Sequence, residues 1–278
     1  MIVSSVSSSH IPSLNFKAGM TKAIKSEILM TDCNKVQKIL QKEKGINANF
    51  AGNKVIAWSV YNVTKLLSGL RGLCKPKTFL PLNIMTRNVD DFYEDDDSFI
   101  CGFTNYLPYK NVENPKESLP AMSIIFNKDF DWENLDGLSD IFSFRGVTTT
   151  DHFLEPFFHE FSHIMHGGNL MLKHSADKLP KVFDDMFDEG NKAKYRQKYQ
   201  AHVRLNLCSY ALESPLEMIA SDMSKRLISN LSEDSMHFKK NPFRLSPYDP
   251  FNFLSTPKKE YDIFVKEVFN GNLNSLYD

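Results

Sequence analysis

The sequence lacks a net charge of either sign, and it lacks any long apolar run. Its 33 lysines and arginines nearly balance 34 aspartates and glutamates, so the formal net charge is −1. Such a chain has no global field that would attract nucleic acid or an anionic membrane. No apolar stretch approaches the ~18 residues of a membrane-spanning helix. We therefore expect a soluble protein, a monomer, with no nucleic-acid partner and no membrane span.

Cysteine is also scarce. Its four residues are Cys33, Cys74, Cys101 and Cys208, which are widely separated and contain no C-x-x-C pair. A chain of 278 residues can bury a large core without disulfides, so isolated cysteines favour thiols in a reducing compartment. Two disulfides remain the alternative. A structural zinc site built on cysteine would need paired ligands, and these are missing.

The first 16 residues, MIVSSVSSSHIPSLNF, contain neither a basic segment nor a continuous apolar segment. They are therefore not a Sec signal peptide. Serine-rich, unfolded starts occur in proteins that bacteria export by contact-dependent secretion, and also in many cytosolic proteins. We expect residues 1–16 to be a disordered or export-type segment. The chain is then either secreted without a Sec signal, into a host cytosol, or cytoplasmic.

Apolar periodicity predicts helices first, then a small sheet, then helices again. This order predicts the α+β class, with one catalytic domain over 17–278 and a helical subregion over 17–72. Helices are expected at about 17–44, 54–70, 156–166, 192–208, 215–230 and 257–269, and strands at 77–86, 98–106 and 120–126.

His159-Glu160-Phe161-Ser162-His163 is an HExxH motif. Four residues make just over one helical turn, so both imidazoles project from one face and can converge on one metal ion. Glu160 lies about 100° round the helix, where it can reach water in an open metal position. Imidazole suits Zn²⁺. The motif predicts one zinc per chain on His159 and His163, with Glu160 as the general base.

The flanking residues favour a helix around this motif. Thr149 to Asp151 offer caps, Pro156 fits a first turn, and Gly167-Gly168 predicts the end of the helix. Apolar neighbours supply the surroundings of a buried metal helix. The alternative is a surface helix that reads HExxH by chance.

The third metal ligand decides the subclass of enzyme. The pattern HExxHxxGxxH fails, because position 166 is His and position 169 is Asn. A downstream glutamate on a second helix is the other common solution. Ser214-Pro215 begins a helix, and Glu217 is the charged residue of its first turn. We predict Glu217 as the ligand, with Glu213 as its rival. The alternative role for Glu217 is to complement the helix dipole.

HEFSH, followed by SYALESPLEMIASDM, resembles the catalytic domain of anthrax toxin lethal factor and related gluzincin peptidases. The resemblance covers about residues 157–227. It implies a zincin-like fold with a small mixed sheet, and His159, His163 and Glu217 as zinc ligands. Tyr210 precedes Glu217 by seven residues, as in that family. The resemblance thereby implies that Tyr210 stabilises the oxyanion, whereas its alternative role is that of a core tyrosine.

The chain departs from that family at one acidic position. The second acidic residue of the family helix falls on Ser221, with Asp222 beside it. The sequence therefore leaves open whether this chain has a carboxylate that orients a ligand imidazole. We expect His166 to be a half-exposed residue near the helix end.

Together these features predict a zinc-dependent endopeptidase that acts on a protein substrate. In zincin folds an edge strand aligns the substrate by strand addition, and 120–126 is the expected edge. An exported effector or toxin that cleaves a host protein is compatible with the serine-rich start. The competing class is a non-catalytic binding protein with a structural or degenerate HExxH site.

Overall fold

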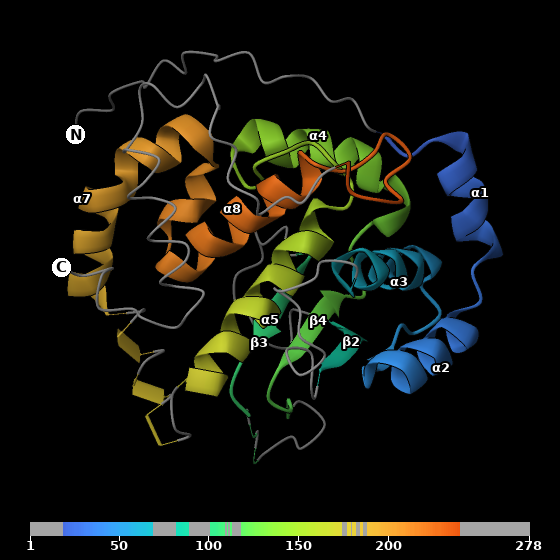
Figure 1. Ribbon diagram of the computed structural model, residues 1–278, viewed down its shortest axis with the longest axis horizontal. Coiled ribbons are helices and arrows are strands. Elements are labelled where there is room, and N and C mark those ends of the chain that lie inside the picture. Colours follow the sequence, from blue (N-terminus) through green and yellow to red (C-terminus); the bar gives the residue numbers. More distant parts are fainter. Residues whose placement is uncertain are drawn as a thin grey trace.

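The computed structural model describes residues 19–68, 82–88, 101–108, 110, 112, 118–173, 177–178, 180–181, 184–185 and 188–239 (Figure 1). Its main helices are α1 (Lys22–Met30), α2 (Cys33–Lys44), α3 (Lys54–Ser68), α4 (Leu135–Arg145), α5 (Glu155–Lys173), α7 (Glu189–Asn206) and α8 (Pro215–Ile228). Two short 3₁₀ helices are η3 (Trp132–Asn134) and η4 (Ser209–Leu212). The strands are β1 (Asn47–Asn49), β2 (Asn83–Arg87), β3 (Gly102–Asn105) and β4 (Ser123–Asn127). The expected segment 1–16 and helix 257–269 lie outside the described residues.

The four strands form one mixed sheet in the order β1-β2-β4-β3. β1 is parallel to β2 and β2 is parallel to β4, whereas β3 is antiparallel to β4. Four of the five residues of β4 are buried, as a central strand requires. The α+β class with a small mixed sheet is confirmed.

The prediction that residues 120–126 form the sheet edge is wrong. β4 pairs with β2 on one side and with β3 on the other. Its uninterrupted apolar sequence, SIIF, indicates burial on both faces rather than an edge. Of the described strands, β3 is the edge strand nearest to α5 (Figure 1).

The first helical region is two helices rather than the single segment expected over 17–44. Thr21 caps α1 and Asp32 caps α2, each accepting a backbone N–H of its helix. These two caps divide the segment that apolar periodicity predicted as one helix.

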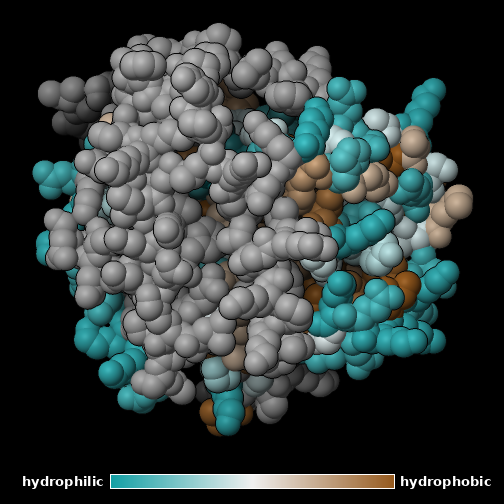
Figure 2. Space-filling model, viewed as in Figure 1, coloured by the Kyte–Doolittle hydropathy of each residue, from teal (hydrophilic) through white to brown (hydrophobic). Residues whose placement is uncertain are grey.

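On the face drawn in Figure 2, the part formed by α1–α3 is mainly hydrophilic, with smaller apolar patches. Within the described residues, no helix is long and apolar enough to cross a membrane.

α5 runs through the middle of the molecule, between the sheet and α8 (Figure 1). Phe157, Phe158, Phe161 and Ile164 are completely buried, and so is the polar Ser162. A helix that is buried on all sides belongs to the core. The predicted end at Gly167-Gly168 is wrong, because α5 continues to Lys173.

An aromatic cluster fixes α5 to the central strand. The Phe157 ring lies 5.1 Å from that of Phe126 on β4 and 5.4 Å from that of Trp132, centroid to centroid. The Trp132 indole donates to the Asn127 carbonyl at 2.7 Å. Offset and tilted aromatic pairs of this kind stabilise a core beyond their area burial. They place the first turn of α5, and with it the HExxH residues that follow, at a defined position on the sheet.

α4 was not expected from the sequence. Its segment, LDGLSDIFSFR, contains a glycine and buries few side chains, so apolar periodicity is weak. The helix ends at Gly146, whose φ of 73° is left-handed and suits glycine. The Gly146 carbonyl then accepts the Tyr210 N–H at 3.2 Å, which joins the end of α4 to η4.

Candidate metal centre

α5 carries His159, Glu160 and His163 within its continuous helical part. The two histidines are one turn apart, and their ring centroids are 4.7 Å apart. Their Nε2 atoms approach to 3.1 Å. The side chain of His163 is 6% exposed and that of His159 is 14% exposed. The helical spacing thus produces the pair of converging imidazoles that the motif predicts.

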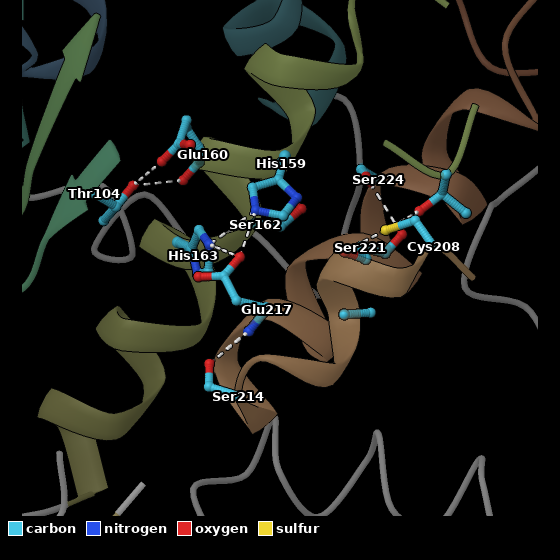
Figure 3. Close-up of polar contacts among 12 residues, drawn as sticks. Thr104, His159, Glu160, Ser162, His163, Cys208, Ser214, Glu217, Ser221 and Ser224 are labelled. Atoms are coloured by element: carbon cyan, nitrogen blue, oxygen red, sulfur yellow. Dashed lines mark hydrogen bonds and ion pairs between the residues drawn. The ribbon is translucent and has the colours of Figure 1, made fainter. Parts of the chain in front are cut away.

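α8 brings Glu217 to this pair. Ser214 caps the helix by accepting the Glu217 N–H at 3.2 Å, and Pro215 occupies the first turn. Glu217 is therefore in the first turn, where the helix dipole favours a carboxylate. Its side chain leaves the helix end and reaches across to α5 (Figure 3).

The three side chains form a close triangle. Glu217 Oε2 lies 3.0 Å from His159 Nε2 and 3.4 Å from His163 Nε2. Figure 3 shows the three groups pointing toward one another between the two helices. Among the described residues, this is the only set of three or more histidine, cysteine or acidic side chains close enough to hold one ion.

The dimensions of the triangle fit zinc. Zn–N and Zn–O bonds of about 2.0–2.1 Å in a tetrahedron place ligand atoms about 3.3 Å apart. The separations here are 3.0, 3.1 and 3.4 Å. Two imidazole nitrogens and one carboxylate oxygen are also the donor types that zinc binds. His159, His163 and Glu217 would hold the ion and leave a fourth position for water or substrate.

Charge in the cluster is arranged around Glu217. Burial alone would raise the pKa of Glu217, but attraction to His163 and hydrogen bonds from both imidazoles hold it well below its ordinary value. Burial opposes the charged form of His159, yet the Glu217 carboxylate raises its pKa above 6.5. The pair therefore favours an ionised carboxylate, the form that binds metal.

Glu160 turns toward the sheet. It is 6% exposed, and its Oε2 accepts a hydrogen bond of 2.7 Å from Thr104 Oγ1 on β3 (Figure 3). The same hydroxyl lies 3.3 Å from the Glu160 carbonyl. Nearby, burial and the Glu160 charge raise the pKa of the Cys101 thiol to about 12. The Cys101 thiol therefore stays protonated in the metal-free protein.

Tyr106 contacts the far side of a candidate ligand. It directly follows β3, and its hydroxyl lies 2.7 Å from His163 Nδ1. The two rings meet edge to face, with centroids 6.1 Å apart. Thr104 and Tyr106 are two residues apart, so both project from the same side of the strand toward α5. Neither was singled out from the sequence.

Tyr210 lies beside His159, one of the three residues of the cluster. It is part of η4, its ring centroid is 6.2 Å from that of His159, and the residue is 42% exposed. A residue this exposed is not fully buried in the core, and its role as an oxyanion donor stays a prediction. Because η4 immediately precedes α8, Tyr210 and Glu217 approach His159 from the same part of the chain.

Glu155 connects the start of α5 to η4. Its buried carboxylate accepts the N–H groups of Thr149 and Thr150 at 2.6 and 2.7 Å. Thr149 Oγ1 lies 3.5 Å from the Cys208 sulfur, directly before η4. These contacts fix the segment from Gly146 onward, on which the Tyr210 backbone rests. From the sequence, Glu155 could be interpreted only as an acidic residue that complements the dipole of α5.

The remaining candidates lie elsewhere or differ from expectation. Glu213 is exposed and faces Arg196 at 3.8 Å, so it is not part of the triangle. Asp222 pairs with Arg226 at 2.6 Å, and Ser221 lies 3.6 Å from the Cys208 sulfur. The expectation that His166 is half-exposed is wrong. It is completely buried because α5 continues past it, and burial lowers its pKa to about 3.

Comparisons of the chain with protein-family models, curated proteins and solved structures found no match.

Proposed function

We propose that this protein is a zinc-dependent endopeptidase with a zincin-like active site. The observation that supports this most is the triangle of His159, His163 and Glu217, with Glu160 on the same helix. The ligands come from two helices, and the carboxylate of Glu160 is left outside the triangle. A two-histidine, one-glutamate set is typical of catalytic rather than structural zinc sites.

The chemistry is divided among the residues. Zinc bound to the triangle would supply Lewis-acid chemistry, polarising a peptide carbonyl and lowering the pKa of water. Glu160 accepts the proton of the attacking water and passes it to the leaving amine. Thr104 holds the Glu160 carboxylate by one hydrogen bond and thereby restricts its rotation. Tyr210, beside His159, donates to the carbonyl oxygen as negative charge develops on it.

The substrate is proposed to be an extended peptide. β3 is the edge of the described sheet, packs on α5, and carries Thr104 toward Glu160. A peptide strand added at this edge would run past the candidate metal centre, with its backbone hydrogen-bonded to β3. Export into a host cell, with a host protein as substrate, remains a further proposal that rests on the lethal-factor-like sequence and the serine-rich start.

The competing proposal is a non-catalytic protein whose metal is structural. A structural zinc is closed by four protein ligands. The described residues supply three. The side chain of Glu217 is 19% exposed, which leaves access to the cluster. A buried carboxylate oriented by Thr104 beside such a cluster also has no function in a structural site.

The decisive test compares wild type with Glu160→Gln. The variant should keep about one zinc per chain and an unchanged fold, because Glu160 is not a ligand. Its rate on a cleaved protein substrate should fall by at least about 10²-fold, because a positioned general base contributes that much. Zinc content is measured by elemental analysis, and cleavage by a proteome-wide screen followed by kinetics on one substrate.

Two glutamate variants provide matched controls. Glu217→Ala should lose zinc and activity together, whereas Glu213→Ala should keep both, since Glu213 is exposed and faces Arg196. Near-wild-type turnover in Glu160→Gln would contradict the mechanism. Zinc loss in Glu213→Ala but not in Glu217→Ala would contradict the ligand set.

A further inference from the structure

We propose that Tyr106 is a positioning residue for the metal ligand His163, and that Gly167 is the space that admits its ring. This inference rests on the proposed metal site. It assigns to a tyrosine on the strand side the task that a carboxylate performs at many histidine ligands, which is to hold the second ring nitrogen.

The first observation is the hydrogen bond itself. Tyr106 Oη and His163 Nδ1 are 2.7 Å apart, a short and therefore well-formed contact. His163 Nε2 faces the opposite way, toward His159 and Glu217. A histidine that binds metal through Nε2 carries its hydrogen on Nδ1. Tyr106 Oη is placed to accept that hydrogen, and so it favours the tautomer and ring orientation that binding requires.

The second observation is how tightly Tyr106 packs on α5. Gly167 is one turn after His163, and a Cβ built on it would lie 2.3 and 2.5 Å from the Tyr106 ring carbons Cδ1 and Cε1. Real Cβ atoms do not approach so closely, so any larger residue would displace the ring. Glycine in the middle of a helix is otherwise unfavourable, by about 1 kcal/mol relative to alanine. Close approach of the tyrosine explains why α5 carries one here.

The third observation is that the Tyr106 backbone is fixed. Its carbonyl accepts the Met122 N–H at 3.2 Å, directly before β4. The strand therefore holds the backbone, Gly167 accommodates the ring, and the hydroxyl contacts His163. A phenol held at three points can orient an imidazole, whereas a mobile one cannot.

The test measures zinc affinity by competition with a chelator. Tyr106→Phe keeps the ring and deletes the hydroxyl, and we expect the Kd for zinc to rise about 10–100-fold. The melting temperature of the metal-free protein should stay close to the wild-type value. A merely structural role would produce the reverse, with a lower melting temperature and unchanged zinc affinity.

Tyr195→Phe is the matched control. It deletes another buried tyrosine hydroxyl, which donates to the Ala211 carbonyl and not to a ligand imidazole. This variant should lose stability but keep its zinc affinity. An unchanged Kd in Tyr106→Phe, or an equal rise in Tyr195→Phe, would overturn the inference.

A second variant tests the packing. Gly167→Ala should also weaken zinc binding, because the added Cβ pushes the Tyr106 ring away from α5. In a Tyr106→Ala background the same change should have little further effect, since the ring is gone. Additive losses would overturn the assigned role of Gly167. If the wild-type protein binds no zinc, the proposed function fails. If the wild-type protein binds zinc and the variants bind it with the same Kd, only the inference about Tyr106 and Gly167 fails.

Discussion

The role of Glu217 depends on the residues of α5 that face it, His159 and His163. Ser214 and Glu217 have the spacing of a capping box, in which the glutamate returns to the start of its own helix. Here Ser214 does cap α8, but the Glu217 carboxylate contacts His159 and His163 instead. The sequence identified Glu217 as a candidate ligand, while the choice between capping and the cluster depends on α5.

Tyr210→Phe tests the residue whose ring lies beside His159. The residue is 42% exposed, and its ring centroid lies 6.2 Å from that of His159. We expect kcat to fall about 10–10³-fold, the range for a lost oxyanion donor, with zinc content and melting temperature nearly unchanged. Kinetics and thermal melting on the same variant provide the measurement.

The outcome that would contradict this role is a loss of about 1 kcal/mol in stability with turnover intact, which is the pattern of a structural hydrogen bond.

At the scale of elements, β3 and the residue that follows it provide two contacts to the candidate site. It supplies Thr104 to Glu160 and leads directly into Tyr106, which contacts His163. Strand periodicity alone places these two side chains on one face. It does not identify the helix that the face meets, because that pairing depends on how the sheet packs against α5.

Thr104→Val tests the strand's effect on the base. Valine keeps the shape of threonine but cannot donate to Glu160, so the carboxylate becomes free to rotate. We expect kcat to fall about 10-fold, because a misplaced base loses part of its advantage, while zinc affinity stays at the wild-type value.

Thr104→Ser should restore most of the rate, since it keeps the hydroxyl. Thr31→Val is a distant control that removes a hydroxyl bonded to the Glu27 carbonyl on α1. Equal rates in Thr104→Val and wild type would show that Glu160 needs no partner on β3.

At the scale of the whole molecule, zinc would join α5 to α8. These two helices pack against each other in the core (Figure 1), and the candidate ligands meet between them (Figure 3). An ion that binds the folded protein alone stabilises it by about 2.7 kcal/mol at 100 times its Kd. For a chain of this size that corresponds to a rise of roughly 5–10 °C in melting temperature, which chelation should remove.

The gain in stability from zinc should also depend on pH. Without metal, Glu217 stabilises the fold above about pH 4.5, and this contribution is lost as pH falls through its lowered pKa. His159 contributes below about pH 6.5, and its contribution is lost as pH rises through its raised pKa. The metal-free pair is therefore strongest between these values. Zinc needs unprotonated imidazoles, so its gain should increase from about pH 5 to about pH 7.5.

Melting temperatures with zinc and with chelator, measured across this range, provide the test. A gain that is constant with pH, or largest near pH 5, would show that the histidines do not bind the ion.

The sequence by itself determined the features that depend on local chemistry. Four-residue spacing placed His159 and His163 on one helix face, and Ser214-Pro215 began the helix that presents Glu217. The order of helices and strands gave the α+β class. Local sequence gave the wrong end for α5, since Gly167-Gly168 reads as a stop when neighbours are unknown.

Only the tertiary structure decided which groups meet. β4 is central and β3 is the edge because of strand pairing between distant segments, which periodicity cannot specify. Tyr106 and Gly167 are 61 positions apart and are significant only as a contact. The exclusion of Glu213 and the burial of His166 likewise follow from packing around α5. Spacing along a chain fixes the direction of a side chain within its own element, but the partner it reaches depends on how the elements pack.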